Sequence, residues 1–157
     1  DLILHKHIRR NQMNPKIVRE AQGVILNSLG DNITVKFTGE DTNKQFAIVQ
    51  QKNQPGTGLP PHVHSNEDEV FKLIQGQVKF RLNNQEHVLS AGDAVFCPRG
   101  IPHSWEVIGD EQAVVDLTII PAGMEKMFAE ISAIDNQKEN MNQIKNILNT
   151  YGISMIH

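Results

Sequence analysis

Three histidines and one glutamate in this chain have the types and spacing of a metal-binding set. His62 and His64 are separated by one residue, Glu69 follows shortly afterwards, and His103 lies beyond a second turn. Imidazole nitrogens combined with one carboxylate suit Fe, Mn, Ni, Cu or Zn, and suit Ca or Mg poorly. The sequence therefore predicts one divalent transition metal (Fe, Mn, Ni, Cu or Zn) held by His62, His64, Glu69 and His103.

Local sequence indicates how the histidines are positioned. Two prolines precede His62 and His64, and side chains alternate between faces along such an extended segment. Both imidazoles therefore point to one face, toward the interior if Val63 points outward. His103 follows a turn that contains two prolines, whose fixed backbone angles could hold its imidazole against the other ligands.

Glu69 begins the next apolar segment and alternates in step with Phe71 and Leu73. Its carboxylate is therefore expected to enter the interior with those two side chains. Glu67 and Asp68 come just before this segment, and we expect them to be solvated acids of the turn.

The elements that must position these residues are short strands. Between Gly23 and Pro121, alternating or continuous apolar segments are interrupted every 8 to 12 residues by Gly, Pro, Asn or Asp. This spacing is typical of an antiparallel sandwich or barrel. Gly76 and Asn83 lie in expected hairpin turns, because Gly and Asn tolerate positive φ. The expected strands cover residues 24–29, 33–38, 45–51, 69–74, 77–82, 87–89, 94–97, 104–108 and 113–120.

The apolar period changes to a helical one after Pro121. Met124, Met127, Phe128 and Ile131 recur at helical spacing, and a second such pattern begins at Met141. We expect a single domain over residues 1–157, with an N-terminal arm or edge strand at 1–22, a β-barrel at 23–121 and two C-terminal α-helices within 122–157, packed on the outside of the barrel.

Composition limits the partners. The 157 residues carry a formal net charge of −3 with acids and bases interspersed, so a nucleic-acid partner is not expected. The longest apolar runs fall short of the about 20 residues that span a bilayer, so no membrane partner is expected. The one cysteine, Cys97, forms no internal disulfide and is expected to be a small buried hydrophobe. These features favour a soluble, cytoplasmic protein.

Two stretches of the sequence resemble the motifs of the cupin superfamily. The first cupin motif resembles the segment 56–76. In this segment Gly56, His62-Val63-His64, Glu69 and Gly76 follow one another with five, four and six residues between them. The second cupin motif is similar to a segment that begins at Gly92. Five residues separate Gly92 from Pro98-Arg99-Gly100, and two more separate that tripeptide from His103. The last position of this second motif, usually Asn, is Val107 here. That position is not a metal ligand, so the departure concerns the polarity of the cavity.

The resemblance implies an all-β fold, the cupin double-stranded β-helix or jelly-roll barrel, with the ligands at one mouth and two C-terminal α-helices. Further details resemble the quercetin 2,3-dioxygenase-like branch: Gly58-Leu59-Pro60-Pro61, Pro121-Ala122-Gly123-Met124 and Tyr151-Gly152-Ile153. Covering of exposed sheet edges would make the protein a homodimer.

Resemblance to quercetinase-like cupins implies a metal-dependent dioxygenase acting on a small aromatic or enolizable substrate. Glu69 would then be both metal ligand and catalytic base. Two alternatives stay open: a metal-dependent isomerase or lyase of a small sugar or hydroxy acid, and a cupin that binds a small-molecule ligand without turnover. The expected pocket lining comprises Phe71, Trp105, Phe80 and Phe46.

Overall fold

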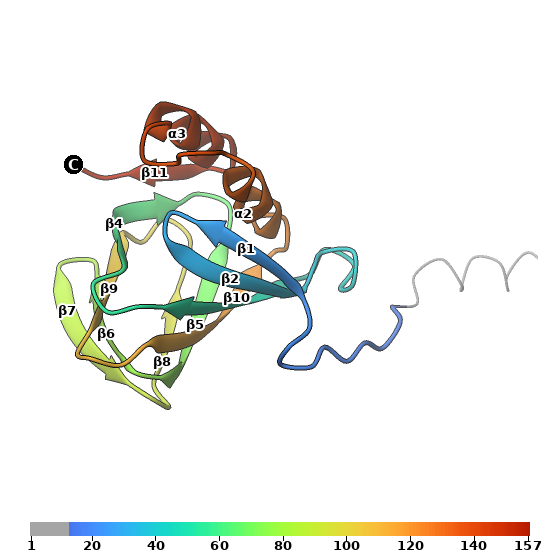
Figure 1. The fold of residues 1–157 in the computed structure, drawn as a ribbon, viewed down its shortest axis with the longest axis horizontal. Helices are drawn as coiled ribbons and strands as arrows, with labels where there is room; N and C mark the ends of the chain where they lie inside the picture. Colours follow the sequence, from blue (N-terminus) through green and yellow to red (C-terminus); the bar gives the residue numbers. More distant parts are fainter. Residues whose placement is uncertain (1–12) are drawn as a thin grey trace, which may run out of the picture.

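The computed structural model describes residues 13–157, which form two antiparallel sheets that face each other as a barrel (Figure 1). The expected all-β cupin barrel is confirmed. The first sheet has the order β1 (Val24–Ser28), β2 (Asp31–Phe37), β3 (Ala47–Asn53), β10 (Ala113–Ile120), β5 (Asp68–Gln75) and β8 (Ala94–Cys97). The second has the order β11 (Ile153–Met155), β4 (Gly58–His64), β9 (His103–Ile108), β6 (Gln77–Leu82) and β7 (Gln85–Ser90).

The strands follow the alternation expected from the sequence. In β3 every second residue from Ala47 to Asn53 is buried, and these inward side chains contribute to the core. β3 begins two residues later than expected, because the Thr42 hydroxyl donates a hydrogen bond to the Phe46 carbonyl at 2.5 Å and keeps the preceding residues in a loop.

Gly76 makes the tight connection between β5 and β6. Its φ is +80°, and a Cβ added there would lie 2.8 Å from the Gln112 carbonyl oxygen. Both facts require glycine at this position. Asn83 also has a positive φ, +54°, in the turn between β6 and β7, as expected.

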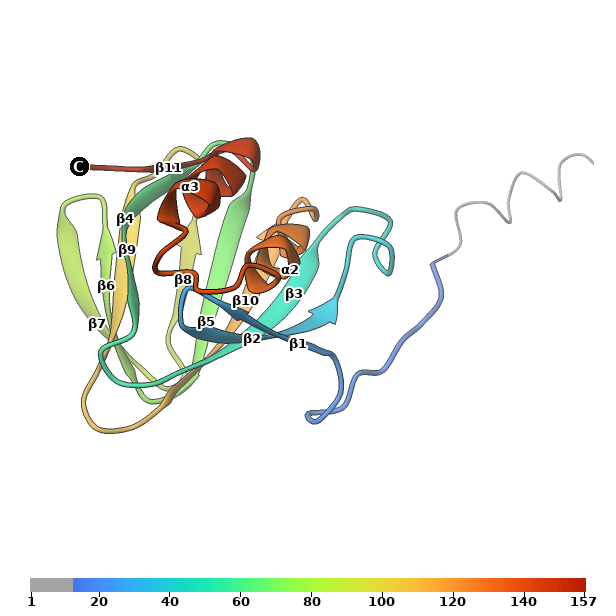
Figure 2. The same ribbon diagram turned by 45° about the horizontal axis from the view of Figure 1, so that its top comes forward.

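Two helices lie together at one end of the barrel (Figure 2). They are α2 (Glu125–Ser132) and α3 (Met141–Thr150), and α2 packs against β1 while α3 packs against β11. The expected helices are present, but their apolar faces do not simply cover the outside of the barrel. Met127 and Leu148 line the interior cavity, so the helices close one mouth of the barrel.

β11 was not expected from the sequence. It pairs with β4 in register Ile153↔His64 and Met155↔His62, so it supports the strand that carries two of the predicted metal ligands. The N–H of Ile156 also donates a hydrogen bond to the Pro61 carbonyl at 2.9 Å. A strand of only three residues offers too little alternation to be recognised in the sequence.

Residues 13–22 contain no helix or strand. The Lys36 ammonium donates hydrogen bonds to the carbonyls of Arg19, Glu20 and Gln22, which ties the end of this segment to β2. The rest of the expected N-terminal arm, residues 1–12, lies outside the described residues.

Across residues 13–157, neither helix has the length and apolar character that crossing a membrane requires.

Candidate metal centre

The second sheet brings the three histidines together. His62 and His64 both point inward from β4, and His62 is paired directly with His103 on β9. All three are buried, with exposed fractions of 2%, 5% and 2%. Among residues 13–157, these three form the set whose ligand atoms all lie within 4.8 Å of one another.

Hydrogen bonds fix the imidazoles of His62 and His103. The Nδ1 of His62 lies 2.8 Å from the Pro60 carbonyl oxygen, and the Nδ1 of His103 lies 3.1 Å from that of Ile101. A carbonyl oxygen only accepts, so the hydrogen is assigned to Nδ1 in both rings. Each Nε2 is left with a free lone pair, as a metal ligand requires.

Glu69 reaches the same place from the opposite sheet. It is 3% exposed, and its Oε2 lies 3.4 Å from His64 Nε2 and 3.1 Å from His103 Nε2. Glu69 Oε2 and His103 Nε2 are both buried without a hydrogen-bond partner. Two acceptor atoms at this separation repel each other unless a cation or a proton lies between them. The residues therefore fit a divalent metal ion.

The electrostatics of the site agree with this arrangement. Burial, reinforced by the neighbouring His103, lowers the pKa of His62 to about 4. Burial opposes protonation of His103, but its contacts with Cys97 and Glu69 outweigh burial and raise its pKa to about 10. Burial also acts to raise the pKa of Glu69, yet the nearby imidazoles of His103, His64 and His62 hold that pKa below its usual range. The site thus favours a negative Glu69 beside a positive charge.

Glu67 was expected to be a solvated turn acid, and this was wrong. It is 7% exposed, and its Oε2 lies 3.7 Å from His64 Nδ1, on the side of the ring away from Glu69. Neither atom has a hydrogen-bond partner. Asp68 does face solvent in part, where its carboxylate receives hydrogen bonds from the Arg99 guanidinium.

Cys97 is buried as expected, at 2% exposure. Its Sγ lies 3.1 Å from His103 Nδ1, a contact that the sequence did not indicate. The register Glu69↔Cys97 between β5 and β8 explains how it reaches the ligand set.

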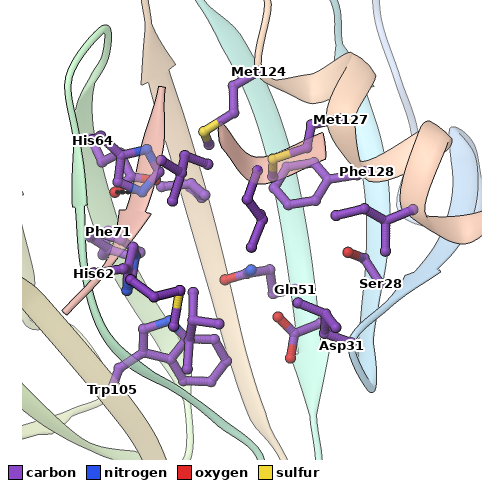
Figure 3. A pocket seen from close by; sticks show the side chains of 18 residues that line it. Ser28, Asp31, Gln51, His62, His64, Phe71, Trp105, Met124, Met127 and Phe128 are labelled. Atoms are coloured by element: carbon purple, nitrogen blue, oxygen red, sulfur yellow. Dashed lines mark ion pairs between the residues drawn. The ribbon is translucent and has the colours of Figure 1, made fainter. Parts of the chain in front are cut away.

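Three of the four candidate ligands, His62, His64 and Glu69, border an interior cavity of about 50 Å³ (Figure 3). Phe71 and Trp105 line it, as the sequence predicted. Met124, Met127 and Phe128 from the start of α2 and the residue before it form another part of the wall. Most of the cavity wall is apolar, and three of the candidate ligands lie on one side of it.

Phe80 and Phe46 do not line this cavity. Phe80 lies behind His103, with the two rings stacked at a centroid distance of 5.9 Å, and it borders a second cavity of about 20 Å³ together with Val107. Phe46 is half-buried in the loop before β3. Alternation predicts which face of a strand a residue occupies, but not which of two cavities on that face it borders.

Comparison with known proteins agrees with the geometry. Residues 50–120 match the family model of the cupin domain, and this segment contains all four predicted ligands. Residues 50–120 therefore form a cupin domain.

Curated relatives of this cupin have different functions. Quercetin 2,3-dioxygenase of Bacillus subtilis (strain 168) is 29% identical over 86 residues, which are 55% of this chain and 26% of the relative. An oxalate-binding protein of Thermotoga maritima is 31% identical over 68 residues, 43% of this chain and 56% of the relative. The chain thus spans about a quarter to a half of the length of these relatives.

Solved structures share the fold of this cupin at low identity. KdgF from Halomonas sp. superimposes with a TM-score of 0.62 at 20% identity, covering 72% of this chain and 99% of the other. Identity at this level supports the barrel architecture alone.

Three polar residues on the cavity wall of this cupin were missed from the sequence. Ser28, Asp31 and Gln51 come from β1, β2 and β3, and all three are buried. Alternation places Asp31 in step with Ile33 and Val35, and Gln51 in step with Val49. The signal was therefore present, but polar residues near strand ends are usually solvated.

Proposed function

We propose that this cupin is a metal-dependent enzyme of the dioxygenase type. Its substrate would be a compact, enolizable molecule that binds the metal through an oxygen atom. The observation that carries the proposal is the convergence of His103 Nε2 and Glu69 Oε2, 3.1 Å apart and both without a hydrogen-bond partner, beside a cavity that Glu69, His62 and His64 line. His62, His64, Glu69 and His103 would hold a redox-active metal. When bound, that metal would supply a binding position for a substrate oxygen atom, and it would also supply electron transfer to dioxygen.

The protein's own side chains perform the remaining tasks. Glu69 is placed to take the proton of an enol or hydroxyl group, because its Oε2 faces the ligand position. The walls at Phe71 and Trp105 exclude water and orient a flat ligand. In this low-dielectric setting the charge of Glu69 acts more strongly than it would in water.

The size of the cavity favours small ligands. A volume of about 50 Å³ accommodates about four water molecules, or a ligand of a few heavy atoms. A multi-ring flavonol would require displacement of the helices that close the mouth. We therefore favour compact β-dicarbonyl, catechol-like or hydroxy-acid ligands.

Metal content and oxygen consumption test the proposal. Elemental mass spectrometry of protein expressed with a defined metal supply is expected to find about one Fe, Mn, Ni or Cu per chain. An oxygen electrode should then record consumption with pentane-2,4-dione or catechol and little with quercetin. The double variant H62A/H103A should lose metal and oxygen consumption while retaining its circular dichroism spectrum. H87A, which changes an exposed histidine on β7, is the matched control.

A second candidate function is binding of a small ligand without turnover. It is supported by the small cavity and by the similarity to the oxalate-binding protein of Thermotoga maritima. Stoichiometric metal, measurable oxalate binding by calorimetry and no oxygen consumption with any of the three substrates would favour this candidate. Full metal retention by H62A/H103A would contradict both.

A further inference from the structure

The cavity has a second group of polar side chains, remote from the metal ligands. Ser28, Asp31 and Gln51 line it with exposed fractions of 4%, 9% and 6%. In Figure 3, Ser28 and Asp31 lie on the side of the cavity opposite His62 and His64, with Gln51 between. The two sides come from different sheets, since β1, β2 and β3 belong to the first sheet and β4 to the second.

These three side chains make no hydrogen bond within the described part of the chain, whereas other acids such as Asp41 and Asp116 do. Their polar atoms keep access to the space of the cavity, unlike the sealed Glu69 Oε2. Burying a polar group without a partner costs stability, so natural proteins rarely keep one without a reason. Asp31 carries the largest cost. Burial raises its pKa to about 7, and no charge or hydrogen bond opposes this effect.

Apolar side chains lie around and between the two polar groups. Leu117 of β10, with Met127 and Phe128 of α2, contributes to the wall that they share. A ligand that satisfies the whole cavity therefore needs an oxygen donor for the metal at one end, a short apolar middle, and a hydrogen-bonding group at the other end.

We propose that Ser28, Asp31 and Gln51 form a recognition subsite for the terminal hydroxyl of a compact hydroxylated carboxylate whose other end binds the metal centre. This inference rests on the metal site of the proposed function and names its ligand class. A hydroxyl suits the three side chains because it both donates and accepts, as do serine and glutamine. A second carboxylate would be repelled by ionised Asp31, while a hydroxyl fits both protonation states of that group.

Matched ligand pairs test the subsite. Lactate and glycerate differ only by a terminal hydroxyl, as do 2-hydroxybutanoate and 2,4-dihydroxybutanoate. The terminal hydroxyl is farther from the carboxylate in the second pair than in the first. Isothermal titration calorimetry with the full chain loaded with Co²⁺ would give each dissociation constant. In at least one pair the hydroxylated ligand is expected to bind about tenfold more tightly, as one hydrogen bond to a buried acceptor would provide.

Variants assign that gain to the subsite. D31L and Q51L should each abolish the difference within the pair and leave lactate binding and Co²⁺ stoichiometry unchanged. D110L, which changes an exposed acid outside the cavity, should preserve the difference. Because leucine introduces no buried polar group, the subsite variants are expected to fold, and circular dichroism checks this.

The outcomes separate this inference from the proposed function. Equal affinities within both pairs in the unmodified protein, or a gain that survives in D31L and Q51L, would overturn the subsite while the metal site stands. Failure of the protein to bind Co²⁺ would overturn the proposed function and the subsite together.

Discussion

Glu67 is a buried carboxylate beside His64, one of the candidate metal ligands. Its Oε2 lies 3.7 Å from His64 Nδ1, while His64 Nε2 faces Glu69. The other two histidines have backbone carbonyls in the equivalent position, at Pro60 and Ile101. An acceptor on Nδ1 orients the ring and makes Nε2 more basic. Glu67 is the buried acceptor nearest His64 Nδ1, although at 3.7 Å the two atoms are not hydrogen-bonded.

Removing Glu67 should therefore weaken metal binding without removing a ligand. We expect E67A to lower Co²⁺ affinity about 10- to 100-fold, the usual effect of losing such a partner. E67Q should lose less, because its amide oxygen can still accept from Nδ1. Competition with a chromophoric chelator measures the affinity. E86Q, which changes an acid in an exposed pair with Arg81, is the control, and unchanged affinity in E67A would contradict the role.

Asp31 should make stability depend on pH. Its pKa is about 7 in the folded chain against an ordinary value of 3.8, so the folded state binds the proton more tightly. The stabilisation from that proton is complete below pH 3.8 and is lost as pH rises through 7. The loss reaches up to about 4 kcal/mol at the upper end.

The neutral variant D31N should remove this dependence. The stability of D31N relative to the unmodified chain is expected to increase between pH 5 and pH 8 by about 3 kcal/mol. Urea denaturation of metal-free protein at both pH values measures it. The other titratable groups on the cavity wall, His62, His64 and Glu69, are present in both proteins and cancel in the difference. A difference that stays constant with pH would show that Asp31 is not buried as an acid.

At the residue scale, alternation was sufficient to predict that His62, His64 and Glu69 point into the barrel. Two histidines two positions apart on a strand share a face, and Glu69 shares one with Phe71, so local geometry carried the information. Glu67 could not be predicted in this way. The turn before it is held by hydrogen bonds from Ser65 and Asn66 to the carbonyls of Gly152 and Tyr151, which are far along the chain.

At the scale of elements, the strands were predictable and the closure of the cavity was not. Helical periodicity located α2 and α3 and the apolar face of each, but not the surface that each face covers. The places of β11 and α3 in the fold are set by their contacts with β4 and α2. These contacts are long-range, and no local pattern encodes them.

The turn between β5 and β6 gives a prediction for an element. G76A should destabilise the protein by about 2–4 kcal/mol, for two reasons. The backbone at position 76 must keep φ at +80°, and the Cβ of the new alanine would meet the Gln112 carbonyl and Ala113. G56A is the matched control. Gly56 has φ +83° with no atom within 4 Å of an added Cβ, so only the backbone cost of about 1–2 kcal/mol applies.

Urea denaturation of the three proteins measures both changes. The difference between G76A and G56A reports the steric contact alone. Equal destabilisation would mean that the loop around Gln112 moves away to accommodate the methyl group.

At the scale of the whole molecule, part of a sheet edge stays open within residues 13–157. Ser132 and Gln137 bond the backbone of Asn27 on β1, but the start of that strand has no such cover from the described part of the chain. β1 ends the first sheet, and its Val24 and Ile25 are 61% and 69% exposed. An exposed apolar edge strand can pair with another chain, and proteins usually protect such edges or use them. We expect two copies to pair through β1 around a two-fold axis, which extends the sheet across both barrels.

Sedimentation velocity at micromolar concentration tests this homodimer. The unmodified chain should sediment as a dimer and I25K as a monomer, because two-fold symmetry places both new charges in the same interface. V88K introduces the same charge on β7, the edge of the other sheet, where Val88 is 58% exposed, and should remain dimeric. A monomeric unmodified chain would disprove the homodimer, and dissociation by V88K instead of I25K would move the interface to β7. Since β1 also carries Ser28 into the cavity, the dimer would stabilise the strand that bears part of the polar subsite.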